Sequence, residues 1–138
     1  MGAWGTGAFD NDSAADWAGD LADAAPGQRV GIIRATLAAV AEHEGSLDCG
    51  DGEEAIAAAA VVASTLPGGP TIDEGYGPDA EVKAGMSIEA DLVPLARRAL
   101  SRVLEESSEW RELWEEAGKF EEVLEALGPV LRALDQRG

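Results

Sequence analysis

The chain has 138 residues, enough for one hydrophobic core, so the sequence predicts a single domain over residues 1–138 that needs no metal or disulfide. Its formal net charge is −17, and because so acidic a surface repels nucleic acids and anionic lipids, we expect no nucleic acid and no membrane as a direct partner. The single cysteine excludes an internal disulfide, and the lack of a basic leader or a long apolar run predicts a cytoplasmic protein.

The first ten residues carry two aromatic side chains, Trp4 and Phe9, among three glycines. Exposed aromatic rings gain nothing in water, so we expect this segment to form an ordered arm that packs on the rest of the fold. Glycines ahead of a helix can also form a phosphate-binding loop, but Asp10 and Asp12 at the expected helix entrance would repel phosphate. The glycines are therefore predicted to supply the backbone turns that let the rings dock.

A helix is predicted from about residue 11 to residue 25, with Asn11 or Asp12 as its N-cap. Helical spacing gives it one apolar face that includes Trp17 and Leu21. The opposite face is acidic, and no base of this helix offsets it. An acid near a helix C-terminus is unfavourable, so local helix stability does not explain the whole row. The acids of this face are Asp12, Asp16, Asp20 and Asp23.

Two more helices are predicted in the middle of the chain. One follows Pro26-Gly27, has an apolar face from Val30 to Val40, and has Gly45 as its stop. The next is predicted to begin with Asp51 as its N-cap and Glu54 in the reciprocal capping position. From residue 55 to residue 66 this helix is apolar nearly all round, which predicts the most buried element of the fold.

The rest of the chain predicts an irregular segment, then three helices. The segment covers residues 67–91, with a short helix near residues 80–83. The helices cover about 91–106, the stretch after a Ser107 or Ser108 cap up to Gly118, and the stretch from Phe120 onward, which Gly128-Pro129 should bend. No strand is compelling. The predicted fold class is all-α, a single compact bundle of five to six helices with an ordered N-terminal arm.

Acidic residues near the N-terminus could in principle bind a hard cation. Asp10, Asp12 and Asp16 offer oxygen ligands, but neither their spacing nor that of the acids in residues 48–54 matches an EF-hand loop. The lone Cys49 and the lone His43 make a Cys/His metal cluster or a nucleophile–histidine pair improbable. We therefore predict no metal and no cofactor, and no residue stands out as catalytic.

Two other groups of side chains have a structural and a functional interpretation. Trp110 and Trp114 lie at helical spacing, which is more typical of a core than of a ligand platform. Arg97, Arg98 and Arg102 are predicted to offset neighbouring acids, and a site for an anion or a partner is the second interpretation.

Two stretches resemble a known family. The first is Gly2-Ala-Trp-Gly-Thr-Gly-Ala-Phe-Asp-Asn-Asp12 with the following Ala15-Asp16-Trp17, and the second is Ala99-Leu-Ser-Arg-Val-Leu-Glu-Glu-Ser-Ser-Glu-Trp-Arg-Glu-Leu-Trp-Glu-Glu116. They are similar to the characteristic stretches of a bacterial domain of unknown function, the family numbered 4259. The resemblance implies a small, stand-alone bacterial protein, and it brings no catalytic residue, cofactor or substrate.

These patterns favour a protein-binding module of the immunity or regulatory type, because uncompensated acidic faces attract basic protein partners. One alternative is a metal-dependent enzyme that uses clustered carboxylates, those around Asp10–Asp16 together with the Glu-rich segment near Glu115. Another is a structural homo-oligomer whose interface is the Trp110 and Trp114 face. Since no catalytic pattern is present, an enzyme is the less expected class. The residues predicted to bind the partner are Asp12, Asp16, Asp20, Asp23, Glu112, Glu115 and Glu116.

Overall fold

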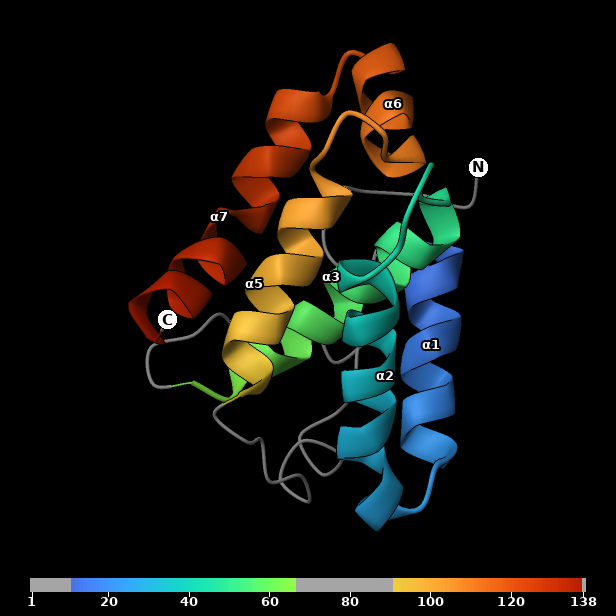
Figure 1. The fold of residues 1–138 in the computed structure, drawn as a ribbon, viewed down its shortest axis with the longest axis vertical. Coiled ribbons are helices and arrows are strands. Elements are labelled where there is room, and N and C mark those ends of the chain that lie inside the picture. Colours follow the sequence, from blue (N-terminus) through green and yellow to red (C-terminus); the bar gives the residue numbers. More distant parts are fainter. Residues whose placement is uncertain (1–10, 67–90, 138) are drawn as a thin grey trace.

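The computed structural model describes residues 11–66 and 91–137, and in this part of the chain the fold is all-α, as predicted (Figure 1). The predicted arm over residues 1–10 and the predicted short helix near residues 80–83 lie outside the described residues. None of the described helices is both long enough and apolar enough to cross a membrane. Six α-helices and one 3₁₀ turn are present in the described part: α1 (Asp12–Asp23), η1 (Pro26–Gln28), α2 (Arg29–Ala41), α3 (Cys49–Ser64), α5 (Leu92–Val103), α6 (Glu109–Glu116) and α7 (Phe120–Arg137).

Helix α3 is the centre of the fold, and it contacts α1, α2, α5, α6 and α7 (Figure 1). Every side chain from Ala55 to Ala63 is buried, which confirms the predicted central element. Most of these residues are alanine, so neighbouring helices can approach closely. The approach is tightest at Gly52, where an added Cβ would lie 3.2 Å from the Cβ of Trp110 on α6.

Helix α1 begins as the sequence predicts. The side chain of Asn11 is the N-cap, and its Oδ1 accepts a hydrogen bond of 2.7 Å from the backbone N–H of Ala14. The predicted apolar face is buried, with Trp17 and Leu21 in the core. The indole Nε1 of Trp17 donates to Thr36 Oγ1 at 3.0 Å, which joins α1 to α2 through a polar contact at the edge of the core.

The predicted capping role of Asp51 is wrong. Helix α3 begins at Cys49, and Asp51 lies in its first turn. The N–H of Cys49 instead donates to Glu109 Oε1 of α6 at 3.3 Å. Two backbone hydrogen bonds bring these helix starts together: Leu47 donates to Ser107 at 3.0 Å, and Glu109 donates to Leu47 at 2.8 Å. The cap comes from a residue far away in the sequence, so no local pattern could reveal it.

The C-terminal helices form the other side of the bundle. Ser108 is the N-cap of α6, and its Oγ accepts from the N–H of Arg111 at 3.5 Å. The helix ends at Glu116, and Gly118 follows it with a φ of +72°, a backbone conformation that favours glycine. Trp110 is 2% exposed and belongs to the core, whereas Trp114 is half-buried against it. Helix α7 then continues through Pro129 to Arg137.

Candidate functional site

The predicted acidic row of α1 is fully present on the molecular surface. All four aspartates are exposed, on the side of the helix opposite Trp17 and Leu21. None of them forms an ion pair with an arginine or lysine in the described part of the chain. The row is therefore an uncompensated charged face made of Asp12, Asp16, Asp20 and Asp23.

Acids at the start of α3 extend this row across the boundary between the two helices. The pKa of Glu54 is raised from its usual 4.5, first by burial and then by the negative charges of Asp51 and Asp20. The pKa of the buried Glu53 is also raised, by burial and by Asp12, although a hydrogen bond with Ser13 acts in the opposite direction. The acids of α1 and α3 thus repel one another on a common surface. We call it the acidic surface, and it comprises Asp12, Asp16, Asp20, Asp23, Asp51 and Glu54.

A small hollow of about 120 Å³ opens beside the acidic surface, between α2 and α3. The carboxylates of Asp51 and Glu54 line it from α3, and Thr36 and His43 line it from the side of α2. A hydrogen bond positions the ring of His43, since its Nε2 lies 2.9 Å from the backbone oxygen of Ser46. Asp51 and Glu54 contribute two carboxylates to its lining, and no arginine or lysine lines the hollow.

The structure does not join the acids of α6 to this surface. Glu112, Glu115 and Glu116 are all exposed, as predicted, but α6 packs on α3 and α7, whereas α1 packs on α2 and α3 (Figure 1). Glu115 also has a partner, because its Oε2 lies 3.4 Å from Arg111 Nε. The α6 acids therefore form a separate and partly compensated group.

The three clustered arginines of α5 have different environments. Arg97 pairs with Asp135 of α7 at 3.3 Å, and Arg102 pairs with Glu105 at 3.3 Å, so both offset neighbouring acids as predicted. Arg98 is exposed and forms no ion pair within the described residues.

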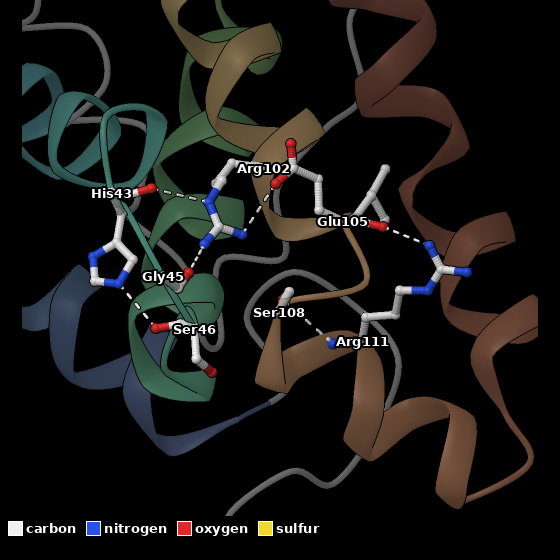
Figure 2. Close-up of polar contacts among 8 residues, drawn as sticks. His43, Gly45, Ser46, Arg102, Glu105, Ser108 and Arg111 are labelled. Atoms are coloured by element: carbon white, nitrogen blue, oxygen red, sulfur yellow. Dashed lines mark hydrogen bonds and ion pairs between the residues drawn. The ribbon is translucent and has the colours of Figure 1, made fainter.

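Arg102 is buried and has a second role that no local sequence pattern indicates. Its guanidinium donates to the backbone oxygen of His43 at 3.1 Å and to that of Gly45, which binds the loop after α2 to α5 (Figure 2).

Cys49 and the possible metal ligands are the remaining chemical groups in the described part of the chain. Burial, together with the charges of Glu53, Glu109 and Asp48, raises the pKa of the Cys49 thiol to about 12. The thiol therefore stays protonated at neutral pH and is a poor nucleophile. No three His, Cys, Asp or Glu side chains within residues 11–66 and 91–137 are gathered closely enough to hold a metal ion.

Comparison with protein families matches residues 2–126 to the domain of unknown function DUF4259. The chain belongs to this family. No curated protein and no solved structure matches it. The match begins ahead of α1 and extends into α7, so the described helices from α1 to α6 all belong to the DUF4259 domain. The description of DUF4259 names no activity or partner, so the function has to be argued from the surface itself.

Replacing Glu54 with glutamine tests the repulsion within the acidic surface. Because the pKa of Glu54 is raised, folding disfavours the ionised carboxylate; this penalty is present above the folded-state pKa and disappears as the pH falls through it. We expect Glu54→Gln to raise the free energy of unfolding by roughly 0.5–1 kcal/mol at neutral pH, with the difference vanishing near about pH 4. Urea unfolding at neutral pH and near about pH 4 measures this difference in the free energy of unfolding. Glu125→Gln, at an exposed position of α7, is the control. A variant less stable than the wild type at neutral pH would contradict the assignment.

Proposed function

We propose that this DUF4259 protein is a binding module whose acidic surface binds a basic segment of another protein, as immunity-type and regulatory modules do. The observation that carries the proposal is the hollow lined by Asp51 and Glu54. The negative charge of Asp20 on α1 also contributes to the raised pKa of Glu54. A lysine or arginine side chain entering the hollow would meet both carboxylates and remove their mutual repulsion.

The row on α1 suits the same kind of partner. Its four aspartates are exposed and unpaired within the described residues, so they are free to attract positive charge over a distance of several ångströms. A rigid helix holds them, and α1 is itself fixed by the Asn11 cap and the Trp17–Thr36 hydrogen bond. The surface is thus preorganised, which limits the entropy that binding removes.

The two alternative functions receive less support. The carboxylate enzyme relies in part on Asp10, which lies outside the described residues, and the described acids form no metal-binding group. The homo-oligomer relies on the rings of Trp110 and Trp114, but Trp110 is buried within its own chain. Neither alternative has an observation comparable to the hollow beside the acidic surface.

Affinity capture with matched baits tests the proposal. The wild type is compared, at low salt, with Asp16→Asn/Asp20→Asn/Glu54→Gln and with a control, Glu121→Gln/Glu122→Gln/Glu125→Gln, which removes the same charge from the exposed side of α7. We expect a basic protein that the wild type and the control retain and the first variant loses. Its affinity should fall steeply as salt rises, because exposed charges are screened.

Two results would contradict this function. The first is that no captured protein is retained by the control and lost by the first variant. The other is a discriminated partner whose binding is insensitive to salt, since exposed carboxylates would then not carry the affinity. A third bait, Glu112→Gln/Glu115→Gln/Glu116→Gln, shows whether the predicted α6 acids contribute to the same interface.

A further inference from the structure

A groove of about 550 Å³ runs along the solvent-facing side of α5. Its base is one face of that helix, at the i, i+3, i+4 spacing of neighbouring turns. Ala41 at the end of α2 lines one side, and Leu131 and Asp135 of α7 line the other. The side chains that α5 and the residues after it contribute are those of Pro94, Arg97, Arg98, Ser101, Arg102 and Glu105.

The groove concentrates positive charge in a protein that is otherwise strongly acidic. The whole chain has ten lysines and arginines against 27 acids, and three of the ten line this groove. Two of the three have acidic partners that also line the groove: Asp135 pairs with Arg97, and Glu105 pairs with Arg102. Arg98 has no such partner in the described part of the chain, so the groove retains an uncompensated positive charge.

We propose that this groove binds a small organic anion through a phosphate or carboxylate group. The guanidinium of Arg98 offers a planar pair of N–H donors, a geometry that matches both groups. Ser101 lies one turn further along the same face of α5 and adds a hydroxyl donor. Ala41, Pro94 and Leu131 provide apolar surface for the rest of the ligand.

The surroundings of Arg102 supply a second, independent observation. Its side chain is 9% exposed and lines the groove, and its Nη1 is buried with no hydrogen-bond partner in the structure. Glu105 Oε2 lies 3.3 Å from that nitrogen and neutralises its charge without making an aligned hydrogen bond. Because buried polar atoms are generally hydrogen-bonded, this nitrogen is a donor beside the groove that the described part of the chain leaves without an acceptor.

The size and the edges of the groove favour a small ligand over a polymer. Its volume lies within the range of about 300–1,000 Å³ that is usual for small-molecule sites. Asp135 and Glu105 also line the groove, so a long polyanion would meet more negative charge there than a single anionic group does. A single anionic group above Arg98 and Ser101 avoids that repulsion.

Titration of the full chain with phenyl phosphate and with benzoate tests the site, with amide NMR shifts as the readout. We expect saturable shifts in residues 94–105 and 131–135 and about a tenfold loss of affinity in Arg98→Gln. Arg132→Gln is the matched control, because this exposed arginine of α7 does not line the groove and its loss changes the net charge equally.

The two probes identify the anionic group. Binding of phenyl phosphate alone supports a phosphate site, and comparable binding of both probes supports a general site for phosphate and carboxylate. Absence of saturable shifts with either probe would overturn the proposal. So would an equal loss of affinity in Arg98→Gln and Arg132→Gln, since the effect would then come from net charge alone. Because the acidic surface is formed by other residues, a failure here leaves the proposed protein-binding function intact.

Discussion

Replacing Arg102 with leucine should lower the free energy of unfolding by about 3–5 kcal/mol. Arg102 is buried, and its guanidinium is the donor for two backbone oxygens of the loop after α2, those of His43 and Gly45 (Figure 2). Hydrogen bonds to a charged group contribute roughly 1.5–3 kcal/mol each, and leucine can replace neither. Glu105 would also lose its ion-pair partner. The variant should therefore release the loop from α5.

Arg98→Leu is the matched control for this substitution. It removes the same charge from the same helix, but Arg98 is exposed, so we expect a change within about 0.5 kcal/mol. Urea unfolding followed by tryptophan fluorescence measures both variants. Hydrogen exchange should also show faster exchange in the loop of Arg102→Leu. Equal stability of the two variants would mean that the contacts of Arg102 contribute little to the fold.

The second large effect is expected from Trp110→Ala, which should destabilise the protein by about 3–5 kcal/mol. Trp110 is 2% exposed, and its ring centroid lies 6.4 Å from that of Trp114 and 6.3 Å from that of Phe120. Its Cγ, which alanine lacks, also packs over Gly52 where α6 meets α3, 3.7 Å from the position of a Cβ added to that glycine. Removing the indole leaves a cavity between the central helix and the C-terminal helices, and the backbone can close it only in part.

Trp114→Ala provides the comparison, since it removes the same side chain from the same helix. Trp114 is half-buried, so we expect a loss of about 1–2 kcal/mol. Chemical denaturation measures both free energies. If Trp114→Ala is as destabilising as Trp110→Ala and also lowers the oligomeric state in solution, the half-buried ring contributes to an interface between copies, and the homo-oligomer alternative regains support.

Much of the local structure follows from short-range patterns. The apolar faces of α1 and α2 have helical spacing, and a helix end needs only a nearby side chain such as Asn11 or Ser108, or a glycine such as Gly118. The central place of α3 also follows, because a helix that is apolar all round is stable only when other helices surround it. The exposure of the α1 acids is also predictable, because the apolar face of this helix is buried and the acidic face lies opposite to it.

The candidate site was predicted only in part. The α1 half of the acidic surface is visible as a row of aspartates, but the sequence pattern predicts Asp51 and Glu54 to form a helix cap. Their acidic character was a signal that could have assigned them to the surface. Their closeness to Asp20 could not be found from the sequence, because it depends on how α1 and α3 pack.

Periodicity and capping chemistry thus account for the all-α class, the central helix and the acidic face of α1, because each depends on residues within a few turns of one another. Packing between distant segments accounts for the rest. Glu109 caps α3 from α6, and Arg102 holds the loop after α2. The hollow at Glu54 and the groove over Arg98 exist only where helices meet. Such contacts depend on three-dimensional distance between side chains, and a linear pattern contains no measure of that distance.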